Sequence, residues 1–362
     1  MTEFAQDQPA IQLAEAAPRR GPWRWLPGVF FLAVMLLGAV LAALSPGLRQ
    51  PPRGPSIVTG AWSTAFERGL DAGLPWRDPA VTGWASLNDR LFGEARPGAL
   101  VGTGGWLYTA EEFQTAPGQA ARVAGRLRTI EGVRAQLARR GARLVVALLP
   151  AKARLYPEHL GRLRVPAENA GAYSPFLAGL QERGLLAPDL WSALRTGKAG
   201  GPVFLRTDTH WTPLGARVAA QALARAVRAR WPDLDLPAAR FRTMLGPPRP
   251  LAGDLTRFLP VLPALAPAPD ALAVPVTRRL DGGGGLLGAD PIAVTLVGTS
   301  YSADRRWNFA GALEEALGAE VLNLADEGRG PFEPMQAYLK GRNLRDNPPK
   351  LVVWEIPERY LK

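Results

Sequence analysis

The sequence contains no cysteine among its 362 residues and only two histidines, His159 and His210. The lack of cysteine excludes a disulfide framework and a zinc site with thiolate ligands. Two histidines so far apart in the sequence give little support for any other metal site, and no bound metal is expected. No motif indicates an organic cofactor. A scarce histidine with a carboxylate close by, as Asp208 is to His210, is instead a candidate for proton transfer.

Apolar runs long enough to cross a membrane are also scarce, and the sequence has one. Leu26 to Leu44 is a run of 19 uncharged, mostly apolar residues, and about 20 residues cross the core of a bilayer. Trp23 and Trp25 stand at its start, where aromatic rings favour the membrane interface. Basic residues before the run, among them Arg24, predict a cytoplasmic N-terminus.

A cleaved signal peptide is the alternative interpretation of this run, with Val40-Leu41-Ala42 as its cleavage site. The long polar region before the run, and the length of the run itself, favour an uncleaved anchor. Both interpretations place the rest of the chain outside the cytoplasm. We therefore expect a single-pass protein of the cell inner membrane, organised as a cytoplasmic tail over 1–25, a transmembrane anchor over 26–45, a linker over 46–60 and one domain over 61–362.

Acidic residues are too few to balance the basic ones, and the formal net charge is +11. The charges up to Leu26 cancel, so the whole excess lies beyond the apolar run. A basic surface attracts polyanions such as nucleic acid, anionic lipid or an acidic polysaccharide. Export across the membrane removes nucleic acid from these partners. A general bias of the composition towards arginine is the alternative explanation of the positive net charge, and it requires no polyanionic partner.

The main domain shows the pattern of a parallel α/β sheet. Apolar residues recur at helical spacing between Gln119 and Arg140, and Leu144 to Leu149 follows as a continuously apolar strand. A helix followed by such a strand is typical of parallel α/β proteins. The same pattern recurs towards the C-terminus, with strands predicted over 293–297, 321–324 and 351–354 and helices over 310–317 and 333–340.

Two further segments surround the histidine. A short strand over 203–206 is predicted to lead into Asp208 and His210, and a helix is predicted over 214–230 with Thr212 as its cap and Pro213 in its first turn. Residues 246–274 are rich in Pro, Ala and Leu and are expected to form an irregular excursion, a lid or a substrate-facing flap. A glycine run follows at 281–285.

The candidate nucleophile is Ser300, which follows an apolar strand and a glycine and precedes a helical segment. That position presents a hydroxyl at the carboxyl end of the sheet, where ligands of such sheets bind. Asp208 and His210 are two residues apart and point to one side of an extended segment. A carboxylate beside an imidazole fixes its tautomer, and the imidazole then acts as a general base. Each part also has a purely structural explanation. Ser300 would lie in a capped turn, and Asp208 and His210 would be a helix-capping aspartate and a structural histidine.

Together the two stretches resemble the alginate O-acetyltransferase family of periplasmic, SGNH-hydrolase-like proteins. The resemblance covers roughly residues 80–362, and the segments that carry it are Gly105-Trp106-Leu107-Tyr108, Pro150-Ala151-Lys152, Tyr156-Pro157-Glu158, Thr207-Asp208-Thr209-His210-Trp211-Thr212-Pro213, Gly298-Thr299-Ser300-Tyr301-Ser302, Asn323-Leu324-Ala325-Asp326-Glu327-Gly328 and Trp354-Glu355-Ile356-Pro357-Glu358-Arg359.

The resemblance implies an SGNH-hydrolase-like three-layer sandwich with a parallel central sheet, preceded by one N-terminal transmembrane helix. It implies a catalytic triad in a periplasmic domain, with Ser300 as nucleophile, His210 as base and Asp208 as the residue that orients it. It further implies acetyl transfer, through an acetyl-serine, onto hydroxyls of an exported polysaccharide. The acetyl donor is expected to come from a multi-spanning membrane O-acyltransferase partner.

The residues that would contact the substrate are less clearly marked. Asn323 and Gly328 match the expected place of oxyanion donors, although the last strand carries Trp354-Glu355 where an asparagine is typical. Tyr301 is a candidate through its backbone or ring, and core packing is its alternative role. Lys152 is a candidate to meet a substrate carboxylate, and a solvated lysine is the alternative.

Two other functions remain as alternatives, an acetyl esterase that uses the same triad and a binding subunit that does not use it. An acetyl esterase on the same triad differs only in whether water or a sugar intercepts the acyl-enzyme. A non-catalytic polysaccharide-binding subunit of an export complex would not need Ser300 at all. The membrane anchor and the family resemblance favour transfer.

Overall fold

The computed structural model describes residues 25–44, 52–281 and 292–362. The chain divides into two compact units, Met1–Val81 and Thr82–Lys362. The expected cytoplasmic tail therefore falls outside the described residues except for its last position, as do part of the expected linker and most of the glycine run at 281–285.

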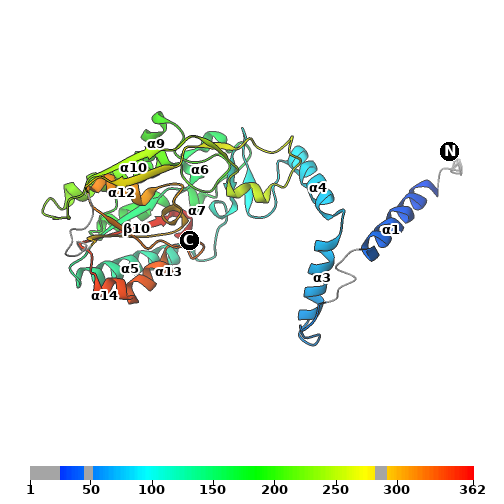
Figure 1. Cartoon of the computed structure of the whole chain (residues 1–362), viewed down its shortest axis with the longest axis horizontal. Helices are drawn as coiled ribbons and strands as arrows, with labels where there is room; N and C mark the ends of the chain where they lie inside the picture. Colours follow the sequence, from blue (N-terminus) through cyan, green and yellow to red (C-terminus); the bar gives the residue numbers. More distant parts are fainter. Residues whose placement is uncertain (1–24, 45–51, 282–291) are drawn as a thin grey trace, which may run out of the picture. The chain divides into compact units, whose positions relative to one another are not determined.

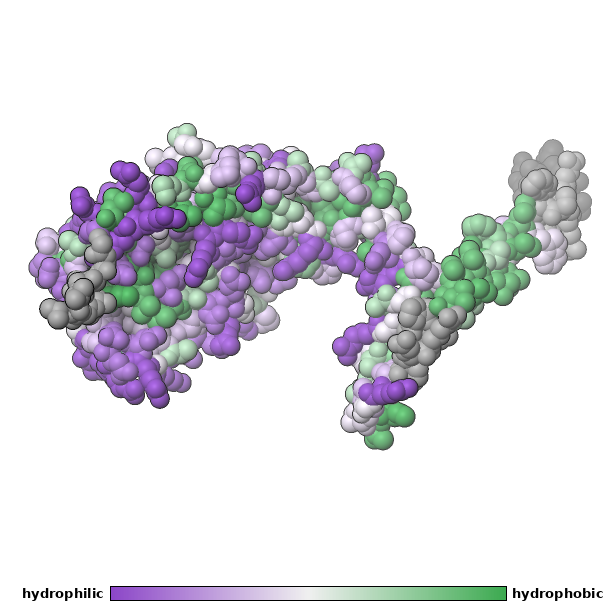
Figure 2. All heavy atoms as spheres, in the orientation of Figure 1, coloured by the Kyte–Doolittle hydropathy of each residue, from purple (hydrophilic) through white to green (hydrophobic). Residues whose placement is uncertain are grey.

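The first unit contains the apolar run as a helix. Helix α1 spans Leu26–Leu44 with a mean hydropathy of 2.4, and its surface is apolar along the described length (Figure 2). It is long and apolar enough to serve as a membrane anchor or as the core of a signal sequence. Helix α3 spans Ala61–Gly73, and helix α4 spans Arg77–Phe92 across the boundary between the units.

A four-stranded parallel sheet forms the centre of the second unit. Its strands are β3 (Arg143–Leu149), β10 (Leu351–Pro357), β8 (Val294–Val297) and β9 (Val321–Asn323), in that order across the sheet. All three neighbouring pairs are parallel. The parallel sheet predicted from the apolar strands is therefore confirmed.

Helices cover both faces of this sheet and make a three-layer sandwich. On strand β3, Val145 and Ala147 pack into one hydrophobic core and Leu144 and Val146 into the other, because successive residues of a strand point to opposite faces. Burying such side chains stabilises the fold by about 1.5–3 kcal/mol each. Figure 1 shows the two helical layers on either side of β10. One layer holds α9 (Leu190–Gly197), α10 (Pro213–Arg230) and α12 (Phe309–Leu317), and the other holds α5 (Gln119–Ala138), α8 (Tyr173–Glu182) and α13 (Phe332–Lys340).

Shorter elements connect these layers. They are β1 (Ala99–Val101), β2 (Leu107–Thr109), η2 (Ala110–Glu112), α6 (Lys152–Leu155), η3 (Pro157–His159), α7 (Ala167–Ala170), η4 (Lys198–Gly200), β4 (Phe241–Leu245), β5 (Arg249–Leu251), η5 (Asp254–Phe258), β6 (Asp270–Leu272), β7 (Pro275–Arg279), α11 (Ser300–Ala303), α14 (Arg342–Asp346) and η6 (Glu358–Tyr360). The expected irregular excursion contains β5, η5 and β6, with β5 and β6 paired as an antiparallel ribbon.

The strand predicted over 203–206 is wrong. Phe204 makes only an isolated antiparallel bridge to Trp211. The chain turns back on itself here, since the Leu205 amide donates to the His210 carbonyl at 3.1 Å and the Thr212 amide donates to the Val203 carbonyl at 3.0 Å. The segment is a loop with Asp208 near its tip, closed by these two hydrogen bonds and not by a strand ladder, although the Arg206 carbonyl accepts from the Leu107 amide of β2 at 2.9 Å.

Candidate active site

The loop that carries His210 is fixed at the start of helix α10. The Thr212 hydroxyl accepts a hydrogen bond from the Gly215 amide at 3.1 Å, and Pro213 occupies the first helical position. This cap satisfies an amide that would otherwise lack a partner, and proline at that position costs no helical hydrogen bond. Both features were predicted from the sequence and are confirmed. The helix therefore holds His210 two residues before its cap.

The loop that carries Ser300 rests on a buried carboxyl group. Strand β8 ends at Val297, and Ser300 begins the short helix α11. The Glu355 carboxyl group, fully buried at the end of the sheet, accepts from the Thr299 amide at 2.7 Å and from the Ser302 hydroxyl at 3.1 Å. A Cβ on Gly298 would come within 2.5 Å of Glu355 Oε2, so the close approach requires glycine. Burial raises the pKa of Glu355.

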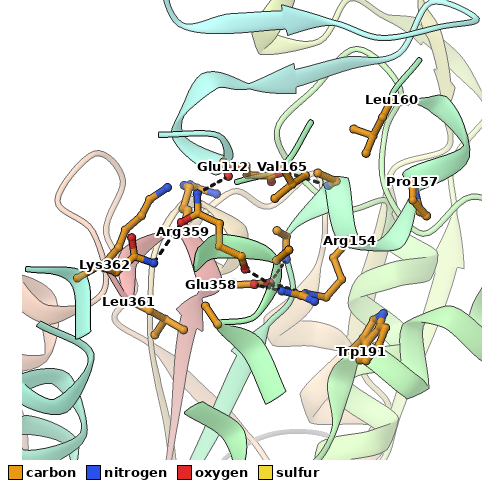
Figure 3. A pocket seen from close by; sticks show the side chains of 16 residues that line it. Glu112, Arg154, Pro157, Leu160, Val165, Trp191, Glu358, Arg359, Leu361 and Lys362 are labelled. Carbon is orange, nitrogen blue, oxygen red and sulfur yellow. Dashed lines mark hydrogen bonds and ion pairs between the residues drawn. The ribbon is translucent and has the colours of Figure 1, made fainter. Parts of the chain in front are cut away.

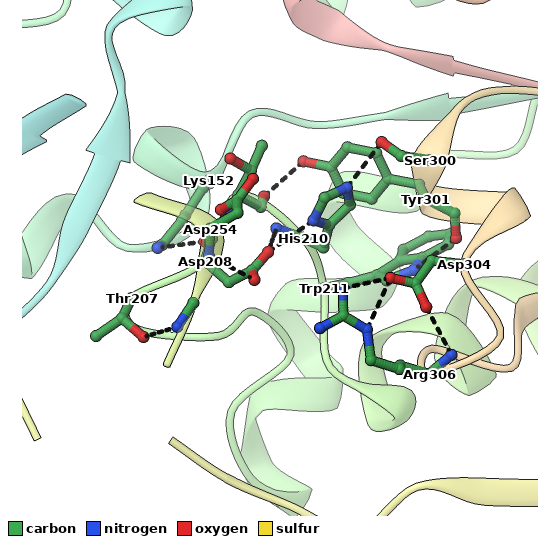
Figure 4. A network of polar contacts seen from close by, with 12 residues as sticks. Lys152, Thr207, Asp208, His210, Trp211, Asp254, Ser300, Tyr301, Asp304 and Arg306 are labelled. Atoms are coloured by element: carbon green, nitrogen blue, oxygen red, sulfur yellow. Dashed lines mark hydrogen bonds and ion pairs between the residues drawn. The ribbon is translucent and has the colours of Figure 1, made fainter. Parts of the chain in front are cut away.

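Asp208, His210 and Ser300 form a continuous hydrogen-bonded row (Figure 4). Asp208 Oδ1 lies 2.6 Å from His210 Nδ1, and His210 Nε2 lies 2.8 Å from Ser300 Oγ. Asp208 Oδ1 also accepts from the His210 amide at 2.9 Å. This is the geometry in which a carboxylate orients an imidazole and the imidazole receives a proton from a hydroxyl.

The charge of Asp208 is stabilised despite its burial. Burial by itself would raise its pKa, but the hydrogen bond from the His210 ring and the charge on that ring lower the pKa to about 2. The second oxygen, Oδ2, accepts from the Asp254 amide at 2.9 Å. Asp208 is therefore a carboxylate at neutral pH, as its role beside His210 requires.

Two aromatic rings pack against the imidazole of His210. The His210 ring centroid lies 4.7 Å from that of Tyr301 and 5.3 Å from that of Trp307, with the Trp307 ring stacked. The Tyr301 hydroxyl donates to the Thr209 carbonyl at 2.7 Å, and the Tyr301 carbonyl accepts from Trp211 Nε1 at 3.1 Å. Tyr301 thus packs and ties the histidine loop, which is the alternative role considered for it. Its amide already faces the Thr299 hydroxyl at 3.4 Å.

Ser300 and His210 open into a cavity of about 350 Å³. Its other lining residues include Thr209, Asp254 and Arg257. A second cavity, of about 260 Å³, lies at the carboxyl ends of β3 and β10 and contains neither Ser300 nor His210 (Figure 3). That cavity is lined largely by apolar side chains and by the ion pair of Arg154 with Glu358.

Lys152, the candidate to meet a substrate carboxylate, is buried behind the triad and is not solvated. Only 1% of its surface is exposed, and Nζ donates to the backbone carbonyls of Leu107, Arg206 and Asp208 at 2.6, 2.9 and 2.9 Å. Burial lowers the pKa of Lys152, while the charges of Glu112 and Asp208 favour the ammonium form. The three carbonyls use all three donors of that ammonium. Lys152 joins three segments behind the triad.

Asn323 and Gly328 do not line the cavity that holds Ser300. The Asn323 side chain donates to the Ser302 carbonyl at 2.7 Å and accepts from the Ala325 amide at 3.1 Å, so both of its polar groups are engaged in the loop. Gly328 is exposed and has a φ of 77°, a value that favours glycine at a turn. A backbone requirement explains its presence.

Three residues that support the site were missed by the sequence reasoning. They are Gly253, Asp254 and Glu355 as a partner of the Thr299 loop. Asp254 is the only acidic residue between positions 246 and 269, and that isolation could have drawn attention to it. Its Oδ1 accepts from the Thr209 amide at 2.7 Å. Burial and the charge of Asp208 raise the pKa of Asp254.

Asp208, His210 and Asp254 also carry potential metal-ligand atoms within 4.8 Å of one another. These atoms are already used, because His210 Nδ1 faces Asp208 and His210 Nε2 faces Ser300. A metal ion here would have to displace the contact between the imidazole and the serine. The other histidine, His159, stacks on Trp106 with ring centroids 4.6 Å apart and stands outside this group.

Comparison with known proteins gives concordant matches. Residues 99–358 match the family described as "SGNH hydrolase-like domain, acetyltransferase AlgX". The chain is 44% identical over 318 residues to the probable alginate O-acetylase AlgJ of Pseudomonas aeruginosa, covering 84% of this chain and 81% of that protein. It is 41% identical over 338 residues to AlgJ of Pseudomonas syringae pv. tomato, covering 91% and 86%.

A solved structure agrees with these sequences. The O-acetyltransferase domain of Pseudomonas putida AlgJ is 45% identical to this chain and superimposes with a TM-score of 0.68. The match covers 74% of this chain and 92% of that domain. The predicted SGNH-like fold is thereby confirmed.

Proposed function

We propose that this chain, which belongs to the SGNH hydrolase-like acetyltransferase family, O-acetylates alginate or a similar exported polysaccharide by way of an acetyl-serine. The single observation that carries the mechanism is the row Asp208–His210–Ser300, with contacts of 2.6 and 2.8 Å. The names of the AlgJ relatives supply the reaction and the polymer. Each further step below follows from the chemistry of these three side chains.

In the first half-reaction His210 Nε2 takes the proton of Ser300 Oγ as that oxygen attacks the acetyl carbonyl of a donor. The tetrahedral intermediate then collapses, and the donor's leaving group receives the proton from the imidazolium. The product is acetyl-Ser300 with neutral His210. Asp208 remains ionised throughout and stabilises the imidazolium between the two proton transfers.

In the second half-reaction a sugar hydroxyl gives its proton to His210 Nε2 and attacks the acetyl carbonyl of acetyl-Ser300. Collapse of this second intermediate releases the acetylated sugar. Ser300 Oγ takes back the proton, and the triad returns to its starting state. The acetyl group is thus moved from one oxygen to another without net consumption of water.

We place this reaction in the periplasm, with α1 as an uncleaved anchor in the inner membrane. The apolar length of α1 supports the anchor, and the basic residues before it support a cytoplasmic N-terminus. An acetyl donor delivered by a multi-spanning membrane O-acyltransferase would fit an anchored acceptor domain. The polysaccharide would then meet Ser300 during export.

Acetyl-enzyme formation tests the mechanism directly. The full chain in detergent micelles is incubated with nitrophenyl acetate, quenched in acid and digested, and the peptide containing Ser300 is examined by mass spectrometry. We expect one additional acetyl group on that peptide. Ser300→Ala and His210→Ala should lose it, whereas Ser174→Ala, an exposed serine on α8, should retain it. Full labelling in Ser300→Ala would contradict the proposal.

Transfer is distinguished from ester hydrolysis by the fate of the acetyl group. The same reaction with a uronate oligomer as acceptor should give acetylated oligomer in a Ser300-dependent manner. Release of free acetate alone, at every oligomer concentration, would make the protein an acetyl esterase. Acetylation of polymer in cells that carry only Ser300→Ala would instead indicate a non-catalytic subunit.

A further inference from the structure

The short helix η5 is fastened to the loop that carries the triad. The Asp254 amide donates to Asp208 Oδ2 at 2.9 Å, and Asp254 Oδ1 accepts from the Thr209 amide at 2.7 Å. The Gly253 amide donates to the Thr207 hydroxyl at 3.1 Å. A Cβ on Gly253 would overlap the Thr207 carbonyl, so the two backbones are in direct contact. These reciprocal bonds fix η5 relative to the triad.

Arg257 lies on the same face of η5 as Asp254. In a 3₁₀ helix residues three apart are eclipsed, and Asp254 and Arg257 are separated by three positions. Both line the cavity into which Ser300 opens. The helix that braces the triad therefore also carries an arginine at that cavity.

The guanidinium of Arg257 packs on an aromatic ring and has no carboxylate partner among the described residues. Its central carbon lies 4.7 Å from the centroid of the Phe258 ring, within the range of a cation–π contact. A Cβ on Gly98 would overlap that ring, so the backbone packs closely against it. Within the ranges that the structure describes, Arg257 forms no ion pair or hydrogen bond, and its side chain is exposed.

The other charged groups that line the cavity are engaged. Arg359 Nε lies 2.8 Å from Glu111 Oε2, and its Nη1 donates to the Tyr301 hydroxyl at 3.2 Å. Asp254 is bound to Thr209. Among the described residues that line this cavity, Arg257 is thus the cation left without a protein anion. A guanidinium presents a fork of donors that matches a carboxylate.

We infer that Arg257 binds the carboxylate of an acidic sugar next to the one being acetylated, and thereby selects a polyuronate over a neutral glycan as acceptor. This inference rests on the proposed function, because it concerns the acceptor of the same Ser300. Arg257 acts on binding and register along the polymer and takes no part in proton transfer. Its effect is expected in KM for the acceptor more than in kcat.

A matched pair of acceptors isolates the carboxylate. One acceptor is a mannuronate oligomer, and the other is the same oligomer after its carboxyl groups have been reduced to neutral hydroxymethyl groups. For the full chain in detergent, we expect Arg257→Gln to raise KM for the charged oligomer by about tenfold or more, as loss of a charge-assisted hydrogen bond would. KM for the reduced oligomer should be nearly the same in both proteins. Arg257→Lys, which keeps the charge but not the fork, should fall between them.

Salt and a control arginine complete the test. Because the guanidinium is exposed, added salt should raise the wild-type KM for the charged oligomer and reduce the difference from Arg257→Gln. Arg225→Gln removes the same charge from the exposed side of α10, and it should leave both acceptors unaffected. An equal rise of KM for both oligomers in Arg257→Gln, or no rise for either, would overturn the inference.

Direct binding separates this inference from the proposed function. Calorimetric titration of mannuronate oligomer into Ser300→Ala and into Ser300→Ala/Arg257→Gln requires no acetyl transfer. Weaker binding by the double variant supports the assignment even if the protein only hydrolyses esters. Equal binding refutes the assignment even if transfer depends on Ser300 as proposed.

Discussion

The ammonium nitrogen of Lys152 lies 2.9 Å from the backbone carbonyl oxygen of Asp208, the acid of the triad. The same nitrogen contacts the carbonyls of Leu107 and Arg206. The start of β2 at Leu107, the loop that carries Arg206 and Asp208, and helix α6 with Lys152 itself therefore meet at one buried side chain. The backbone of Asp208 is held from behind by Lys152 while its carboxylate holds His210 in front.

Lys152→Met should be strongly destabilising. Methionine keeps the length of the side chain but leaves three carbonyls without their donor, and we expect a loss of about 3 kcal/mol in the free energy of unfolding. Urea unfolding of the full chain in micelles, followed by tryptophan fluorescence, measures it. Lys350→Met removes a cation that is half exposed beside Asp235, and it should cost below about 1 kcal/mol. Equal losses for the two variants would show that the three-carbonyl contact contributes little.

Gly253→Ala should disturb the site through the backbone. The added methyl group would overlap Thr207, so η5 must move away from the triad loop and loosen the bond from the Asp254 amide to Asp208. We expect a loss of about 1–3 kcal/mol in stability, as for overpacking of a core, together with a fall in ester hydrolysis.

The control for this substitution is Gly132→Ala on α5, where a Cβ meets nothing within 4 Å. Alanine there should stabilise the protein by about 0.5–1 kcal/mol, since glycine is unfavourable inside a helix. Both variants are compared by the same unfolding and hydrolysis assays. If Gly253→Ala is as stable and as active as Gly132→Ala, the close contact of Gly253 with Thr207 does not constrain the position of η5.

Asp208→Asn should change how stability depends on pH. The folded-state pKa of Asp208 is lowered to about 2 from the ordinary aspartate value of 3.8 by the hydrogen bond from the His210 ring and its charge. A lowered pKa of an acid contributes stability that is present above the unfolded-state pKa and is lost as the pH falls through the folded-state pKa. The difference in unfolding free energy between wild type and Asp208→Asn should therefore stay level from pH 7 to pH 5 and shrink by about 2 kcal/mol between pH 4 and pH 2.

The measurement is urea unfolding of both proteins at each pH, with esterase activity recorded at pH 7. Activity of Asp208→Asn should fall by about 10²-fold or more, because an amide holds the imidazole in the wrong tautomer. A stability difference that does not change below pH 4 would contradict the lowered pKa of Asp208.

Glu355→Gln should show the opposite dependence on pH. Burial raises the folded-state pKa of Glu355 above the ordinary glutamate value of 4.5. A raised pKa of an acid contributes stability that is present below the unfolded-state pKa and is lost as the pH rises through the folded-state pKa. The stability of Glu355→Gln relative to wild type should therefore increase as the pH rises above 4.5. Glutamine cannot ionise, so its burial is equally costly at every pH.

The matched control is Glu182→Gln at the end of α8, where the side chain is exposed and is solvated before and after unfolding. Its stability relative to wild type should not follow the trend of Glu355→Gln. Unfolding free energies of the three proteins between pH 4 and pH 8 provide the comparison. A flat difference for Glu355→Gln would mean that Thr299 and Ser302 stabilise the charged form as well as water does.

Local patterns predicted much of the fold because helices and strands are periodic. The helix predicted from Gln119 to Arg140 is α5, which ends at Ala138, and the strand predicted at Leu144 to Leu149 is β3, which begins one residue earlier. The strand predicted over 203–206 failed because apolar residues do not reveal whether the backbone pairs with a sheet or with its own loop. Hydrogen-bond partners far along the chain decide that question.

For the site too, local sequence patterns predicted some features, and others depend on residues far apart in the chain. Asp208 and His210 are two residues apart, and that spacing alone predicted their contact. Ser300 is 90 residues beyond His210; its position after an apolar strand made it a candidate nucleophile, and the family resemblance joined it to the Asp208–His210 pair. The sequence by itself determined the membrane-length helix, the alternation of helix and strand, and the candidate acid, base and nucleophile. Only the tertiary structure decided that Lys152 is buried under three carbonyls, that Asp254 braces the triad and that Arg257 is left free at the cavity, because burial and pairing depend on segments that meet only when the sheet has formed.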